Sequence, residues 1–348
     1  MADSHHGGEC VVARRILRLV SNLRRIDGVQ IGEFVVSNTF IGDKDTLWGG
    51  IRLFFEALSH DVVVMSGGTR RLFVFCLLKF LLPLHRCKTV AVDYILPLPV
   101  SLRQRLTARV KGLLLRKVDR FILHFARTEL YEHFYTIPRA RCLFVPFKVN
   151  YFESIPPLGL LPTDGDYVFT AGRSFRDFST FISAMRQVDY PGLLLYDDAA
   201  LMRKGNTEID LTDLPRNLRA ERNVGERSWI DYIARAKIVV VPLLPTSAYA
   251  PGLSLCLMAM AMRKCVIITE GLSTIDVITT EAIIVPPRDS IAMANAIRQA
   301  WEDENLRRRT ADAGRRYAEH CGDESRLYAD IVSVCGELVN RGNGSSKR

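Results

Sequence analysis

The sequence predicts an α/β protein with two parallel-sheet domains, and three observations support this fold class. The chain has 348 residues, too many for one ordinary hydrophobic core and enough for two domains of about 150 residues each. In both halves, short apolar runs alternate with amphipathic segments, which is typical of parallel strands covered by helices on both faces. A segment dense in Pro and Gly separates the halves, and such residues mark a linker.

These signals predict an N-terminal domain over 1–150, a linker over 151–164, a C-terminal domain over 165–325, and a helix with a frayed tail over 326–348. In the first half we expect strands at 33–37, 60–65, 88–93, 120–124 and 141–145, with helices at 47–58, 71–84 and 128–135. Residues 10–25 fit a basic amphipathic helix as well as a strand followed by a helix. In the second half we expect strands at 166–170, 192–196, 237–242, 265–269 and 282–286, with helices at 178–187, 229–236, 253–262, 290–301 and 305–320.

The net charge of +9 favours anionic partners. Much of it lies in Leu102–Arg127, where eight basic residues accompany one acid, Asp119. Apolar residues interleave with them at helical spacing, which predicts a basic amphipathic helix. Three interpretations stay open: a solvated basic face over a stripe that packs on the core, a membrane-surface contact, or a nucleic-acid contact.

The sequence shows no clear spanning helix, zinc-site motif or signal peptide. The apolar segment 71–84 is shorter than the roughly 20 residues that a spanning helix needs, so we expect a buried or interfacial helix. The eight cysteines include no CxxC pair, so no zinc site is predicted. The polar start of the chain does not resemble a signal peptide, and a cytoplasmic location is expected.

The stretch TAGRSFRDF, residues 170–178, is the first with the pattern of a ligand site. A strand ends there, Gly172 allows close backbone approach, and a helix opens. Arg173 and Arg176 supply forked cationic donors suited to phosphate oxygens, and Ser174 lies between them. The alternative is an ordinary strand–helix turn with two surface arginines.

Two further stretches repeat this pattern. After the strand KIVVVP, Gly252 leads into a helix whose first residues, Leu253 and Ser254, would present free N–H groups to an anion. The loop Asn223, Val224 and Gly225 could present backbone groups to a nucleotide base, or could be only a connecting loop. Trp229, just beyond it, is interpreted as a core residue.

Together these stretches resemble the C-terminal domain of the family-4 glycosyltransferases of the GT-B kind. Gly172, Arg173 and Arg176 are similar to the family's Gly-Arg followed by another basic residue. The segment 259–267, AMAMRKCVI, resembles a helix that ends in Ala-Met-Ala and the strand after it. The segment 282–303 resembles the family's strand, Pro-Pro-x-Asp turn and following helix.

The resemblance implies two Rossmann-like domains that face a central cleft, with the acceptor side in the N-terminal domain and the donor in the C-terminal domain. It implies a hexosyl-type transferase that moves a sugar from a nucleoside-diphosphate sugar to a glycan or lipid-linked acceptor, with retention and without a metal or other cofactor. Arg173 and Arg176 would then be catalytic, because fixed cations stabilise the charge that grows on the leaving diphosphate. No nucleic-acid partner is expected, and an anionic membrane surface is left open as a partner.

One departure from the family concerns its two glutamates, which contact the donor sugar and the ribose. Ala250 and Met258 occupy those positions, and neither side chain accepts a hydrogen bond as a carboxylate does. Met258 remains a candidate for packing on the ribose. The departure keeps open an alternative, a glycosyltransferase fold that serves as a binding or scaffold protein without turnover.

In the first half, Asp93 follows a strand and is the candidate catalytic base or partner of the acceptor hydroxyl. The alternative for Asp93 is a cap of a helix or turn. His124 also ends a strand and, with Arg127, is a candidate for the acceptor side, although a lone His near an apolar strand is more often structural. A nicotinamide-linked dehydrogenase is disfavoured, because no G-x-G-x-x-G motif follows a strand and opens a helix.

Overall fold

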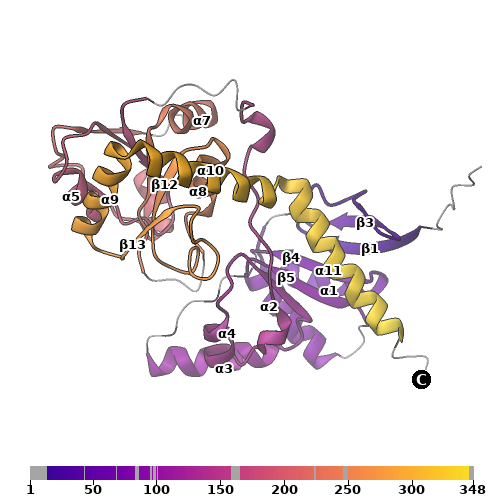
Figure 1. Cartoon of the computed structure of the whole chain (residues 1–348). Coiled ribbons are helices and arrows are strands. Elements are labelled where there is room, and N and C mark those ends of the chain that lie inside the picture. Colours follow the sequence, from indigo (N-terminus) through magenta and orange to yellow (C-terminus); the bar gives the residue numbers. More distant parts are fainter. Residues whose placement is uncertain are drawn as a thin grey trace, which may run out of the picture. The chain divides into compact units, whose positions relative to one another are not determined.

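The computed structural model describes residues 14–42, 44–67, 69–82, 86–94, 96, 99, 101–157, 165–222, 225–245 and 250–344. It contains two parallel-rich sheets, one from each half of the sequence, with helices between the strands (Figure 1). The predicted fold class of two parallel-sheet α/β domains is confirmed.

The first sheet is built from seven strands in the order β2-β3-β1-β4-β5-β6-β7. Their bounds are β1 Arg15–Ser21, β2 Gln30–Ile31, β3 Phe34–Phe40, β4 Val62–Ser66, β5 Lys88–Val92, β6 Arg120–Leu123 and β7 Cys142–Phe144. The short β2 pairs antiparallel with β3, whereas β1, β4 and β6 pair in parallel with their described neighbours. The helices of this half are α1 Leu47–Glu56, α2 Thr69–Leu81, α3 Leu102–Leu115 and α4 Glu129–Tyr135.

The segment that fitted either a helix or a strand forms the strand β1, in the middle of this sheet. Leu17, Leu19 and Val20 are buried there, between β3 on one side and β4 on the other. The predicted apolar helix is α2, which buries Leu72 and Phe75 and leaves its end exposed at Leu81. Within the described part of the chain, no helix is both long and apolar enough to cross a membrane.

The second sheet has six strands in the order β10-β9-β8-β11-β12-β13. The bounds are β8 Val168–Ala171, β9 Gly192–Tyr196, β10 Leu218–Arg222, β11 Ile238–Val241, β12 Cys265–Thr269 and β13 Ile283–Val285, and all described pairings are parallel. This order is that of a doubly wound sheet, which reverses between its first and fourth strands, here β8 and β11. The helices are α5 Phe178–Met185, α6 Ala199–Lys204, α7 Glu226–Arg235, α8 Leu253–Ala261, α9 Ser290–Glu302, α10 Glu304–Cys321 and α11 Glu324–Gly344.

Both faces of the second sheet carry a core. Along β11, Val239 and Val241 belong to one buried cluster, which includes α8, and Ile238 and Val240 belong to the other, which includes α5 and α9. Successive residues of a strand point to opposite faces, so the unbroken valine run of the sequence reflects burial on both sides. Ligands of such sheets bind beyond the carboxyl ends of the strands.

The described residues group into two compact units. The first draws on Met1–Val92, Lys117–Arg120 and Tyr328–Arg348, and the second on Asp93–Arg116 and Phe121–Leu327. The domain boundaries expected from the sequence stay a prediction, and residues 158–164 of the expected linker lie outside the described residues. Every site residue discussed below lies within the second unit.

Candidate functional site

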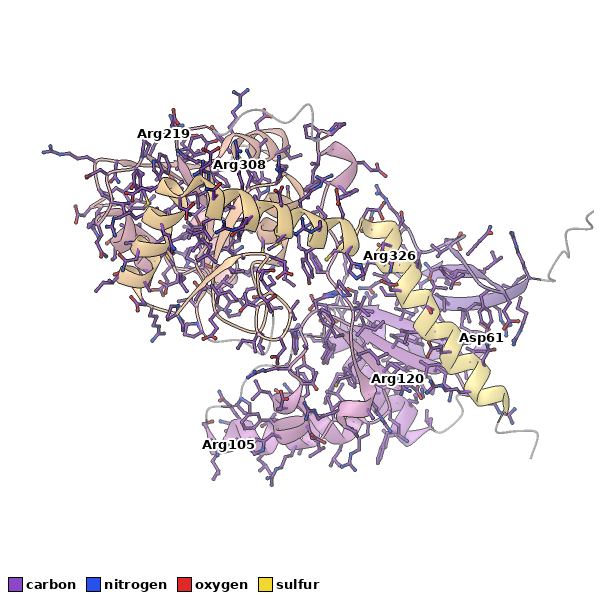
Figure 2. The ribbon with its side chains drawn as sticks, viewed as in Figure 1. Asp61, Arg105, Arg120, Arg219, Arg308 and Arg326 are labelled. Atoms are coloured by element: carbon purple, nitrogen blue, oxygen red, sulfur yellow. The ribbon has the colours of Figure 1, made fainter. Side chains whose placement is uncertain are left out.

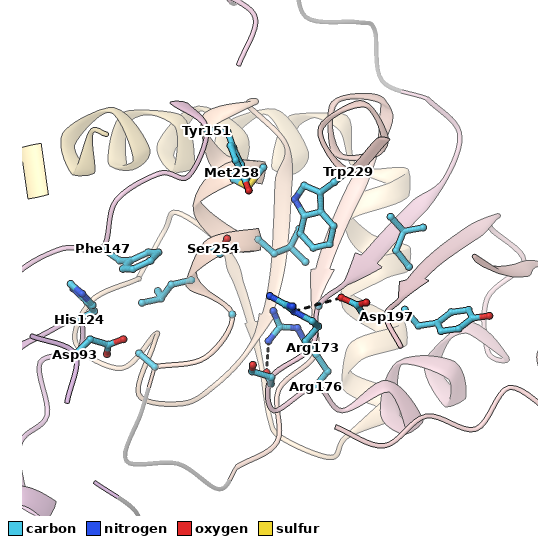
Figure 3. Close-up of a pocket in the computed structure, with 18 of the residues that line it drawn as sticks. Asp93, His124, Phe147, Tyr151, Arg173, Arg176, Asp197, Trp229, Ser254 and Met258 are labelled. Carbon is cyan, nitrogen blue, oxygen red and sulfur yellow. Dashed lines mark hydrogen bonds and ion pairs between the residues drawn. The ribbon is translucent and has the colours of Figure 1, made fainter. Parts of the chain in front are cut away.

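A cavity of about 420 Å³ lies at the carboxyl ends of β8 and β9 and at the start of α8 (Figure 3). Its wall includes the following residues that were predicted from the sequence: Asp93, His124, Gly172, Arg173, Ser174, Arg176, Gly225, Gly252, Leu253, Ser254 and Met258. Asn223 and Val224, also predicted, lie outside the described residues. The structure thus brings together residues that are widely separated in the sequence.

Gly172 directly follows β8 and has a backbone conformation that only glycine adopts without strain. Its φ is +130°, in the region that L side chains rarely occupy. A Cβ atom at this position would lie 2.3 Å from Nε of Arg176. The glycine is therefore required both by the turn and by the arginine packed against it.

Arg176 is buried, and its guanidinium group holds the loop that follows β8. Its Nε donates to the carbonyl of Ala171 at 3.0 Å, and its Nη1 donates to the carbonyl of Ser174 at 2.8 Å. Its own backbone N–H donates to Oγ1 of Thr207. Several donors of Arg176 thus fix the shape of the cavity wall, and its predicted part in catalysis remains a prediction.

Arg173 is the more accessible of the two cations. Its side chain is 59% exposed, and its Nε lies 3.6 Å from Oδ2 of Asp197, as the dashed line in Figure 3 shows. An exposed ion pair of this kind contributes little to stability, so a ligand anion can compete for the guanidinium group. Asp197 also lines the cavity and was not singled out from the sequence, although an acid directly after the strand 192–196 was an available signal.

The start of α8 presents backbone donors to the same cavity. Gly252 precedes the helix with a φ of +87°, and the helix has no side-chain cap. The first N–H groups of a helix have no partner within it and carry a partial positive charge. Leu253 and Ser254 both line the cavity. Oγ of Ser254 accepts a hydrogen bond from Nδ2 of Asn150 at 2.7 Å, a contact that sequence reasoning missed because it joins distant segments.

Asp93 and His124 line another part of the wall, each directly after one of the strands β5 and β6. Asp93 has a φ of +47°, and its N–H donates to the carbonyl of Ile122 at 2.9 Å. Burial raises the pKa of Asp93, and the nearby His124 partly offsets this. A carboxyl group that readily takes up a proton is suited to general acid–base work.

The orientation of His124 is set by two contacts. Its Nδ1 lies 2.8 Å from the carbonyl of Val145, and because a carbonyl only accepts, this nitrogen carries a proton. The ring also contacts Phe147 edge to face, with 4.9 Å between ring centroids. Nε2 is the ring nitrogen that does not take part in this contact, and the role of His124 on the acceptor side stays a prediction. Phe147 lines the cavity too, and nothing in its sequence context pointed to it.

Arg127, the other residue predicted for the acceptor side, does not line this cavity among the described residues. Its Nε donates to Oδ2 of Asp276 at 2.7 Å, and this guanidinium group lowers the pKa of Asp276. The role of Arg127 on the acceptor side stays a prediction.

Ala250 and Met258, at the positions of the two family glutamates, both line the cavity and are buried. Among the described residues of the wall, the acidic side chains are those of Asp93 and Asp197. Trp229 packs edge-on against Phe169, with ring centroids 6.3 Å apart, and also lines the cavity. Trp229 is thus partly buried against the core and also faces the cavity.

Within the described residues, no group of three His, Cys, Asp or Glu side chains lies close enough to hold a metal ion. The cationic and backbone donors of the cavity suit an anion such as a diphosphate.

Comparison with known proteins bears on the family and the fold. Residues 178–303 match the family described as glycosyl transferases group 1. A comparison with curated proteins found no match. Among solved structures, the chain is similar to sucrose-phosphate synthase from Thermosynechococcus elongatus, with a TM-score of 0.62 and 16% identity over 94% of this chain and 89% of that one.

Two more solved structures have the same fold. A glycosyltransferase from Rickettsia africae ESF-5 gives a TM-score of 0.64 at 12% identity, covering 93% of this chain and 98% of that one. HepE of Anabaena, in complex with UDP-glucose, gives 0.61 at 12% identity, covering 93% of this chain and 99% of that one. The resemblance inferred from the sequence is confirmed: the chain has the GT-B fold of these glycosyltransferases, and its residues 178–303 match the group 1 glycosyl transferases.

Proposed function

We propose that this protein is a glycosyltransferase that moves a sugar from a nucleoside-diphosphate sugar to a glycan or lipid-linked acceptor. The observation that carries the proposal is the convergence of Arg173, the loop at Gly172 and the start of α8 on one cavity. All three supply positive charge or N–H donors. The acceptor class, the hexosyl specificity, the retention of configuration and a part in polysaccharide biosynthesis belong to the same proposal and follow from the family resemblance.

On the donor side, the proposed chemistry is electrostatic. Negative charge grows on the diphosphate as the bond to the sugar breaks, and donors that are already in place stabilise it without reorganisation. Arg173 would approach the phosphates, while the N–H groups at the start of α8 would bind them from the helix end. Trp229 is available to stack on the base. UDP is the first nucleotide to test, because HepE was solved with UDP-glucose.

On the acceptor side, Asp93 and Nε2 of His124 are the groups positioned to act on an attacking hydroxyl group. The raised pKa of Asp93 suits a carboxylate that accepts a proton during transfer. No metal is assigned a role in this proposal. We also propose a cytoplasmic location, with access to a membrane surface if the acceptor is lipid-linked.

The donor site is tested by thermal unfolding with a panel of nucleoside diphosphates and their sugars. A ligand at 100 times its Kd should stabilise the fold by about 2.7 kcal/mol. Arg173→Ala should weaken the binding of the active nucleotide by about 10- to 100-fold, the expected loss of a hydrogen bond to a charged group. The matched control is Arg308→Ala, which removes another exposed arginine paired to an acid, Glu304. Equal affinities for both variants would contradict the assignment.

A binding protein without turnover is the second candidate, and the presence of Ala250 and Met258 on the cavity wall favours it. The two candidates share nucleotide binding and differ in catalysis. Release of the nucleoside diphosphate from its sugar, measured with wild-type protein and with Asp93→Asn, separates them. Wild-type release that the variant lacks supports the transferase. Tight binding with no release for any donor supports the binding protein.

A further inference from the structure

The helix α3 exposes an apolar stripe to solvent. Leu102, Leu106, Val110 and Leu113 are 85%, 66%, 53% and 53% exposed. They recur at every third or fourth position and therefore share one face of the helix. The sequence left three interpretations open for this basic segment. The one in which the apolar stripe packs on the core is wrong for these four residues, because their side chains are exposed.

The opposite face of α3 fixes this orientation. Ala108, Gly112 and Leu115 are the buried residues of the helix. A Cβ atom on Gly112 would lie 1.9 Å from the carbonyl oxygen of Tyr135, at the end of α4. The backbone of α3 therefore touches α4 closely, and the helix cannot turn its leucines inward without losing this contact.

The exposed stripe is bordered by positive charge. With about 100° between successive residues of a helix, Arg105, Arg109 and Arg116 flank the stripe on one side and Arg103 flanks it on the other. Figure 2 labels Arg105 among the side chains that extend outward from α3. The segment 101–118 contains no acidic residue, and the described part of the chain offers these four arginines no carboxylate within ion-pair distance.

We propose that α3 is a docking surface for an anionic lipid bilayer. An apolar stripe with arginines on both borders suits a helix that lies in the interface, with leucines among the upper acyl chains and guanidinium groups at lipid phosphates. Nucleic acid fits less well, because its phosphates would face exposed leucines. A second copy of the chain fits less well, because a symmetric contact would bring the same cations together. This inference rests on α3 alone and does not depend on the donor site.

The test is flotation of the protein with vesicles of phosphatidylcholine alone and of phosphatidylcholine mixed with phosphatidylglycerol. Wild-type protein should bind the anionic vesicles, and binding should fall as salt is raised. The double variants Leu106→Ser/Leu113→Ser and Arg105→Gln/Arg109→Gln should each bind the anionic vesicles at least about tenfold more weakly than the wild type. All four side chains are exposed, so folding should be preserved, which thermal unfolding checks.

Matched controls are Ile291→Ser, which removes another exposed apolar side chain, and Arg308→Gln, which removes another exposed arginine. Both should bind vesicles like the wild type. The proposal is overturned if the wild type binds neither vesicle, binds both equally, or binds anionic vesicles unchanged by the α3 variants. It is also overturned if the leucine variant abolishes self-association or capture of a protein while vesicle binding persists.

Discussion

Asp93 combines a left-handed backbone with a partly buried carboxyl group, and holding that group ionised in the folded state costs a free energy that depends on pH. Its pKa is raised mainly by burial, so the native state holds the proton more tightly than the unfolded state does. Between the ordinary and the raised pKa, folding takes up a proton, and stability falls as pH increases. Asp93→Asn removes this dependence, and Asn also tolerates a positive φ.

We therefore expect Asp93→Asn to gain stability relative to the wild type as pH rises through the raised pKa, and to show no such gain well below the ordinary value. Urea unfolding of both proteins over a pH series measures the difference. A stability difference that stays constant with pH would contradict the prediction, because it would mean that the Asp93 carboxyl group has the same pKa in the folded and unfolded states.

Gly172 allows a prediction about the loop that holds the cations. An alanine there places Cβ against the guanidinium group of Arg176 and forces a φ of +130°. Gly172→Ala should cost about 1–3 kcal/mol of stability and weaken nucleotide binding. Gly271→Ala is the control, because no atom lies within 4 Å of its added Cβ and its φ is not positive. Equal unfolding midpoints in urea would contradict the close packing described here.

These residues also show how far the sequence predicted the site. Gly172, Arg173 and Ser254 could be selected because glycine, arginine and helix starts follow strands in a recognisable order. The direction of a side chain could not be predicted, as the guanidinium group of Arg176 shows by donating to backbone carbonyls. Asn150 was missed because its contact with Ser254 depends on the path of the chain between the sheets.

At the scale of elements, periodicity predicted helices and strands better than it predicted which face is buried. The helix α3 carries two stripes, and the buried one contains the small residues Ala108 and Gly112 together with Leu115. For β1, the arginines within its apolar pattern made a helix equally plausible. Arg18 is paired with Asp61 at 3.1 Å, while Leu17 and Leu19 point into the core.

Gly112 allows a prediction about the packing of α3 against α4. In most helices, replacing Gly by Ala gains about 1 kcal/mol. Here the added Cβ would meet the carbonyl of Tyr135, so Gly112→Ala should instead destabilise by about 1–3 kcal/mol, the usual cost of overpacking. Hydrogen exchange should be faster across α3 and α4 in the variant. A stabilised variant would mean that α3 does not lie directly against α4.

At the scale of the whole molecule, residues near the two ends of the chain belong to the same compact unit. Residues from Tyr328 onward group with Met1–Val92. Nη1 of Arg15 donates to Oδ1 of Asn340 at 3.0 Å, and a Cβ on Gly336 would lie 2.9 Å from the ring of Phe34. No periodicity in the sequence could reveal this pairing, since it joins segments more than 300 positions apart.

The side chain of Ile331, on α11, is fully buried. Its truncation should therefore destabilise the first unit, to which this part of α11 belongs. Ile331→Ala should cost about 2–5 kcal/mol and speed hydrogen exchange in β1 and β3. Glu337→Ala is the control on the same helix, because its side chain is 65% exposed and such changes cost at most about 0.5 kcal/mol. Exchange in β8 and β9 should be unchanged in both variants, since those strands belong to the second unit. If Ile331→Ala instead loosened β8 and β9 and spared β1, the last helix would support the cavity-bearing unit rather than the N-terminal sheet.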